Sequence, residues 1–175
     1  MPQINDIFLI CFLTIATVLD FRTSRISNIL IISGASAGLG VQILMHQMTG
    51  IGYWFLGTAG MVTILFVFWL MAVIGAGDIK LFGVIGGFLG IRSGISIFIL
   101  SVAVGAVGAA VLIIFRKNLK ERLFYSKNYF FQLFCLKKSM SDWKYMDIHR
   151  RADDPGAYMH FSMPILLGTL VYLLR

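Results

Sequence analysis

Charged residues are scarce in this chain, and their scarcity excludes an ordinary soluble domain. Only 13% of the 175 residues are charged, whereas 58% are hydrophobic. Soluble domains carry about 25% charged residues. A chain of this composition has too little polar surface to face water on all sides. The composition therefore predicts an all-α membrane protein that crosses the bilayer several times.

Cysteine is also nearly absent, and few residues are arranged to bind a metal. Cys11 and Cys135 form no C-x-x-C pair, so they indicate neither a disulfide framework nor a cysteine-based zinc site. Histidine and acidic residues gather in one polar stretch, but their spacing matches no ligand pattern. These residues are Asp142, Asp147, His149, Asp153, Asp154 and His160. We therefore expect a solvated loop there rather than a metal site.

Uncharged apolar runs make up most of the remaining chain. Three runs have about the 20 residues that a helix needs to cross a bilayer, namely 29–45, 51–77 and 93–115. Three shorter runs cover 7–19, 81–91 and 161–174. The first lacks the basic start and the A-x-A-like site of a cleaved signal peptide, so we expect it to remain as an anchor. The runs predict a bundle of about six transmembrane helices in one membrane-embedded domain, 1–175.

Glycines recur at four-residue spacing within these runs. The pairs are Gly34 and Gly38, Gly83 and Gly87, and Gly86 and Gly90. On a helix the members of each pair share one face and let a neighbouring helix approach closely. The pattern predicts close helix packing rather than chemistry.

The basic residues are distributed unevenly, and this sets the predicted orientation. In a six-span arrangement, all of the fifteen Lys and Arg residues except Arg92 and Arg175 fall on one side. The positive-inside rule places that side in the cytoplasm and both termini outside. Most of these charges belong to the loop 116–160, where basic residues are interleaved with Leu, Phe and Tyr. This composition is typical of an amphipathic helix on the cytoplasmic leaflet. Without a folded soluble domain, it indicates no nucleic-acid partner.

Apart from Asp6, near the outer end of the first run, two of the eight acidic residues lie at the ends of apolar runs, where a charge is costly and calls for a functional explanation. Asp20 ends the first run, and Asp78 begins the fourth. Two predicted spans lie between them, and an even number of crossings returns the chain to the side from which it started. Both aspartates are therefore expected at the cytoplasmic face, where they can meet within the bundle.

Two neighbouring carboxyl groups have a characteristic chemistry. They cannot both ionise cheaply, so one keeps a proton and the pair titrates as a unit. The ionised member can draw a proton from water as that water attacks a carbonyl carbon, while the protonated member donates to the carbonyl oxygen. Gly75 and Gly77 precede Asp78 and carry no side chain that would block an approaching peptide backbone.

The same residues allow a simpler interpretation in which the aspartates are only paired charges. Asp20 can pair with Arg22 or Arg25. Asp78 can likewise pair with Lys80, but residues two apart on a helix point to different faces. The Lys80 side chain is better suited to reach the cytoplasmic headgroups. The residues by themselves leave both interpretations open.

Three segments, taken together, resemble those of type IV prepilin peptidases. The first, "GAGDIKL" at 75–81, is a G-x-G-D-x-K-L sequence at a predicted helix start, like the second catalytic motif of that family. The segment "DFRTSRISN" at 20–28 resembles the first motif, an aspartate followed by basic residues and Ile-Pro-Asn. The segment "FSMPILLG" at 161–168 is similar to the proline and glycine segment of the last helix. Ser27 stands where the family usually has proline, so the bend at this point is open to a different geometry.

This resemblance implies a membrane aspartic endopeptidase with Asp20 and Asp78 as the catalytic pair and with no metal or cofactor. Such an enzyme removes the short basic leader of prepilins or pseudopilins at the cytoplasmic face of the inner membrane, usually after a glycine that precedes a hydrophobic helix. Gly75 and Gly77 are the candidates for substrate approach, and Lys80 belongs to the same motif. The chain lacks the cysteine-bearing N-terminal region of the bifunctional members. The resemblance therefore implies the short peptidase-only form, similar to enzymes of tight-adherence pilus systems, without methyl transfer.

Two other functions are compatible with the sequence. A small proton-coupled transporter or channel would relay ions through Asp20 and Asp78, although no ionisable residue continues that path through the bilayer. A noncatalytic partner in pilus assembly would bind other subunits through the loop 116–160. The sequence assigns neither an oligomeric state nor the acid and base roles of the two aspartates.

Overall fold

The computed structural model describes residues 4–23, 26–71, 74–115 and 161–175. The predicted basic loop 116–160, with Cys135 and the polar stretch considered for metal binding, lies outside these residues. Within them the secondary structure is helical, which confirms the all-α prediction. The helices are α1 (Ile4–Thr23), α2 (Asn28–Leu70), α3 (Ala76–Phe115) and α6 (Ser162–Leu173).

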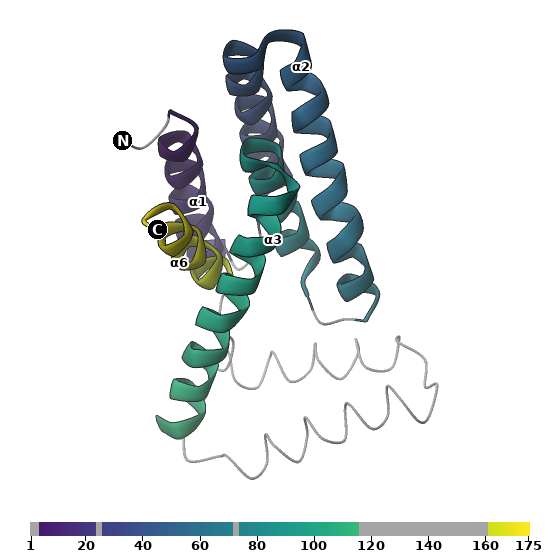
Figure 1. Cartoon of the computed structure of the whole chain (residues 1–175). Helices are drawn as coiled ribbons and strands as arrows, with labels where there is room; N and C mark the ends of the chain where they lie inside the picture. Colours follow the sequence, from purple (N-terminus) through teal and green to yellow (C-terminus); the bar gives the residue numbers. More distant parts are fainter. Residues whose placement is uncertain (1–3, 24–25, 72–73, 116–160) are drawn as a thin grey trace. The chain divides into compact units, whose positions relative to one another are not determined.

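The two long helices are each interrupted by one residue with non-helical dihedral angles. The interruption in α2 is Gln47 (φ 53°, ψ −135°), and in α3 it is Gly90 (φ 82°, ψ 167°). Figure 1 shows α2 folding back on itself at its break, so that its two halves run side by side. Both breaks lie near boundaries between predicted apolar runs. Two helices, α2 and α3 as far as Val111, are long and apolar enough to cross a membrane, and the total of six crossings remains a prediction.

Backbone contacts divide the chain into two compact units. One contains Met1–Gly105 and His160–Arg175, and the other contains Ala106–Met159. Of the second unit, the structure describes only 106–115, the end of α3. All contacts discussed below lie within the first unit, and the single-domain prediction for 1–175 remains a prediction.

The first half of α3 is the central helix of the first unit. Its residues Leu81–Phe88 are all buried, so other helices cover it on every side. Two of the predicted glycines, Gly38 and Gly86, do lie where this helix packs closely against α2. A Cβ on Gly38 would meet the Phe88 ring, and a Cβ on Gly57 would meet the Gly86 backbone. Gly34 lies against the ring of Phe12 in α1 in the same way. Small residues let these helices pack where lipid gives little hydrophobic driving force.

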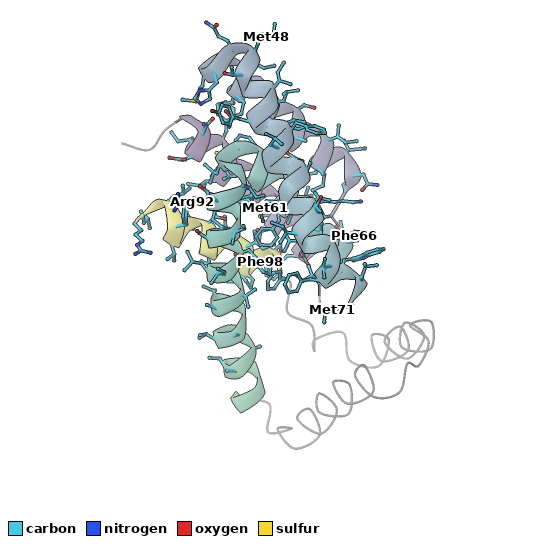
Figure 2. All side chains as sticks on the ribbon, turned by 45° about the vertical axis from the view of Figure 1, so that its right-hand side comes forward. Met48, Met61, Phe66, Met71, Arg92 and Phe98 are labelled. Atoms are coloured by element: carbon cyan, nitrogen blue, oxygen red, sulfur yellow. The ribbon has the colours of Figure 1, made fainter. Side chains whose placement is uncertain are left out.

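Met61 packs against both halves of α3. A Cβ on Gly86 would lie 2.6 Å from Met61 Cγ, and one on Gly94 would lie 2.7 Å from Met61 Sδ. Eight residues of a straight helix would separate these glycines by about 12 Å. The break at Gly90 therefore brings both within reach of one fully buried side chain. In Figure 2, Met48 and Met71 mark the beginning and the end of the second half of α2, and Met61 lies between them.

Gln42 satisfies backbone groups that the break in α3 exposes. Its Nε2 donates to the carbonyl oxygens of Gly87 (3.2 Å) and Phe88 (2.8 Å). In a continuous helix these carbonyls accept from residues four positions later, which here lie beyond Gly90. Gln42 is buried, and an unpaired carbonyl in an apolar interior costs several kcal/mol. The side-chain amide thus makes the break compatible with the bundle.

The outward faces of the helices are strongly apolar. Large exposed hydrophobic side chains follow the second half of α2 in particular: Phe55, Leu56, Phe66, Val67 and Leu70. Such a surface suits lipid rather than water.

The backbone at Gln47 leads to a stability prediction. A positive φ suits glycine and strains other residues by about 1–3 kcal/mol. We expect Gln47→Gly to raise the free energy of unfolding by about 1 kcal/mol, measured as a higher thermal midpoint in one fixed detergent. Met48→Gly is the matched control: Met48 is 82% exposed and lies next to Gln47. There, glycine should lower stability by about 0.5–1 kcal/mol. Equal losses in both variants would contradict the strain at Gln47.

Candidate active site

Asp20 lies near the C-terminal end of α1 and is held by a residue from the other end of the chain. Its side chain is 9% exposed. Ser162 Oγ, on the first residue of α6, donates to Asp20 Oδ2 at 2.7 Å. The carboxyl group therefore lies where α1 and α6 pack together, an arrangement visible in Figure 1 as the purple and yellow helices.

Asp78 lies in the first turn of α3, and Gly75 caps that helix. The Gly75 carbonyl accepts hydrogen bonds from the N–H groups of Asp78 (3.1 Å) and Ile79 (3.3 Å). In return, a backbone hydrogen bond from Gly75 reaches the Asp78 carboxyl group. The Asp78 side chain thus bonds back to the residue three positions earlier, as the acidic residue of a capping box does, and the positive end of the helix dipole favours a carboxylate at this position. The apolar run 51–77 predicted one continuous span, but α2 ends at Leu70 and α3 begins at Ala76, which places Asp78 at a helix start.

The structure brings the two aspartates together from separate helices. Asp78 and Asp20 are close enough to repel each other electrostatically. Asp20 is buried and Asp78 is partly buried. Two interacting carboxyl groups are what the activation of a water molecule by a pair of acids requires.

The two glycines before Asp78 have different surroundings. Gly75 is exposed, and a Cβ there would lie 3.1 Å from Asp78 Oδ2, so the bare backbone is adjacent to the carboxyl group. A Cβ on Gly77 would instead lie 3.2 Å from Ile26 Cδ1. Gly77 thus lets the segment between α1 and α2 pack against α3, whereas Gly75 leaves space beside the carboxyl group.

Lys80 joins the same two segments through a polar contact. Its Nζ donates to Asn28 Oδ1 at 2.7 Å. The contact made by its ammonium group in the structure is therefore with the start of α2, rather than with Asp78 two residues earlier. Together with the packing of Ile26 on Gly77, it fixes the start of α3 against the chain that follows Asp20.

Ser27 forms the N-cap of α2 and preserves a backbone that proline would also adopt. Its Oγ accepts a hydrogen bond from the N–H of Ile29 (3.3 Å), and its φ is −64°. A proline ring holds φ near −65°. Serine at this position therefore keeps the φ of the proline found in the resembled motif and adds a side-chain cap.

The sequence interpretation did not assign a role to Ser162 or Thr17. Thr17 Oγ1 donates to the carbonyl oxygens of Leu13 (2.8 Å) and Ser162 (3.4 Å). Thr17 and Asp20 are three residues apart and thus share one face of α1, which was the available signal. Ser162 lies within the segment 161–168, but nothing in its sequence pointed to Asp20. Within the described ranges, no three or more His, Cys, Asp or Glu side chains gather as metal ligands.

Comparison with known proteins gives one match. The model of the type IV leader peptidase family matches residues 7–110, more than half of the chain and a range that contains both Asp20 and Asp78. No curated protein and no solved structure matches the chain.

The Lys80 contact can be tested without reference to activity. We expect Lys80→Met and Asn28→Ala each to lower the free energy of unfolding by up to about 1 kcal/mol, because each removes one partner of an exposed charge-assisted hydrogen bond. The double variant should lose less than the sum, with a coupling of about 0.5 kcal/mol or more in a double-mutant cycle of thermal unfolding. The control pair is Lys80→Met with Thr49→Ala, because Thr49 lies in α2 just after the break and far along the helix from Asn28. The two losses of unfolding free energy should add in this pair. Additivity in both pairs would show that the contact contributes nothing.

Proposed function

Because this membrane protein belongs to the type IV leader peptidase family, we propose that it is an aspartic endopeptidase whose catalytic residues are Asp20 and Asp78. Its substrates are prepilins or pseudopilins, and it removes their N-terminal leader at the cytoplasmic face of the inner membrane. The observation that carries the proposal is that Asp20 and Asp78, on α1 and α3, are near enough to interact electrostatically. Both lie within the part of the chain that matches the family.

The reaction needs one ionised and one protonated carboxyl group. The ionised group takes a proton from a water molecule while the water oxygen bonds to the scissile carbonyl carbon. The protonated group donates its proton to the carbonyl oxygen, which gives a tetrahedral diol. When the diol collapses, the C–N bond breaks, the leaving nitrogen receives a proton, and the pair returns to its starting protonation. No group outside the pair is required for this balance.

The local backbone supports an approach of substrate at Asp78. Gly75 is exposed and has no side chain beside the carboxyl group. An extended substrate can therefore bring its scissile carbonyl near Asp78 from this side. Lys80 and Gly77 act indirectly, because their contacts with Asn28 and Ile26 hold the start of α3 in place.

The depth of the site suits a substrate that is already in the bilayer. The segment of α3 from Ala76 to the break rises only about 20 Å, less than the roughly 30 Å of a hydrocarbon core. A hydrophobic substrate helix can present the residues at its end to carboxyl groups near the membrane face. The residues after Asp78, Leu81–Phe88, are buried and carry no ionisable group, which disfavours proton relay along this helix.

The central test replaces each aspartate by its amide. We expect Asp20→Asn and Asp78→Asn each to reduce leader removal by about 10³-fold or more, because neither amide can exchange the protons of the reaction. Cleavage of a co-expressed prepilin is read as a gel shift and by N-terminal sequencing, at matched membrane abundance. Asp6→Asn, the same change at the other end of α1, should cleave as wild type does. Cleavage by both amide variants would overturn the proposal, and loss of proton uptake into liposomes on Asp78→Asn would then favour a transporter.

A second test concerns the space beside Asp78. We expect Gly75→Ala to reduce kcat by about 10- to 100-fold, because the new methyl group would lie 3.1 Å from Asp78 Oδ2 and displace the carboxyl group or the substrate. Gly52→Ala is the control, since a Cβ there meets nothing within 4 Å. The measurement is initial cleavage rate in detergent, with thermal midpoints recorded for both variants. Equal rates for Gly75→Ala and Gly52→Ala would show that the space has no catalytic use.

A further inference from the structure

Ser162 lies outside the family match, yet its side chain forms a hydrogen bond with an aspartate of the pair. The match ends at residue 110, whereas Ser162 begins α6. Its hydroxyl group donates to Asp20 Oδ2 at 2.7 Å, and the serine is 1% exposed. The distance is typical of an O–H group bonded to a carboxylate.

We propose that Ser162 is a positioning residue for peptide cleavage, acting through Asp20. The hydroxyl group restrains rotation of the Asp20 carboxyl group and thereby sets its orientation toward Asp78 and the attacking water. This inference rests on the proposed function of the pair. It adds α6, from the far end of the sequence, to a site otherwise built from α1 and α3.

Ser162 can do this because α6 itself is fixed on two sides. On one side, Thr17 Oγ1 in α1 donates to the Ser162 carbonyl oxygen at 3.4 Å, one turn before Asp20. On the other side, a Cβ on Gly168 would lie 2.5 Å from Ser101 Oγ and 2.8 Å from the Ser101 nitrogen, so α6 lies directly on the backbone of α3. A hydroxyl group on an element held at both sides can fix its partner closely.

The position within α6 also favours a negative partner. Ser162 is the first residue of the helix, and its N-cap, Phe161, makes no side-chain cap. The unpaired N–H groups of a first turn and the helix dipole stabilise an anion nearby. Asp78 thus lies in the first turn of α3, whereas Asp20, in the last turn of α1, lies beside the first residue of α6.

Buried apolar and small residues, rather than the Ser162 hydroxyl, dock most of α6. Pro164, Ile165, Gly168 and Thr169 are all buried. Ser162→Ala removes only one oxygen from this interface, so α6 should remain in place while Asp20 loses its donor. The variant therefore separates orientation of the carboxyl group from docking of the helix.

The test measures kcat and KM on a purified prepilin in detergent for wild type, Ser162→Ala, Ser162→Thr, Ser101→Ala and Asp20→Asn. Ser101→Ala is the matched control: Ser101 is fully buried and contacts α6, but its hydroxyl group bonds Ile97 O in its own helix. We expect Ser162→Ala to lower kcat by about 10- to 100-fold with KM within about twofold of wild type. Ser101→Ala should retain wild-type kcat. Ser162→Thr, which keeps the hydroxyl group, should recover at least half of the decrease in log kcat that Ser162→Ala causes.

The outcomes separate this inference from the function on which it rests. Wild-type kcat in Ser162→Ala, with Asp20→Asn inactive, overturns the role of Ser162 and leaves the aspartate pair intact. Equal kcat losses in Ser162→Ala and Ser101→Ala, or a threonine variant no better than alanine at an equal thermal midpoint, also overturn it, because the effect is then structural. Full activity of Asp20→Asn removes the proposed function itself.

Discussion

Repulsion between Asp20 and Asp78 is the constraint on which the arrangement of this site depends. Two carboxyl groups taken out of bulk water and placed together are unfavourable unless polar groups compensate them. The structure supplies compensation to each separately: a backbone hydrogen bond from Gly75 and the first turn of α3 for Asp78, and the hydroxyl group of Ser162 at the start of α6 for Asp20. Two helix starts therefore converge on one pair of acids. This is a direct way to keep such a pair within an apolar bundle.

The break in α3 shapes the helix that begins beside Asp78. The break at Gly90 makes the first half of α3 a short central helix, and it lets Met61 contact the chain on both sides. The carbonyl groups left open by the break are bonded by Gln42. In an apolar setting a broken helix is tolerated only where neighbouring groups satisfy its backbone, and Gln42 does so here.

Contacts between the two aspartate-bearing segments hold the pair in register. The link after α1 packs through Ile26 on Gly77, and Asn28 at the start of α2 bonds Lys80. Both contacts join the segments "DFRTSRISN" and "GAGDIKL" at points one to eight residues from an aspartate. Several residues around the two aspartates thus have a structural role in packing and hydrogen bonding. Glycine at 77 admits a neighbour, whereas glycine at 75 keeps the carboxyl group accessible.

The sequence by itself determined the helical class, the apolar runs that form the helices, and the two aspartates as the acidic residues at the predicted cytoplasmic ends of such runs. These follow from composition and from spacing along one chain, since a charge beside an apolar run is visible without any partner. It also indicated several glycines that face neighbouring helices, such as Gly34 and Gly38, because a four-residue spacing defines a helix face, whereas Gly90 of the same pattern is the break in α3. The tertiary structure alone decided which residues complete the site. Ser162 is 142 positions from Asp20, and Lys80 is 52 positions from Asn28. Ser162 begins one apolar helix and Lys80 lies near the start of another. The local sequence around either residue does not identify its hydrogen-bond partner. Their roles arise only when helix packing brings distant polar groups to hydrogen-bonding distance in a medium that offers them no water.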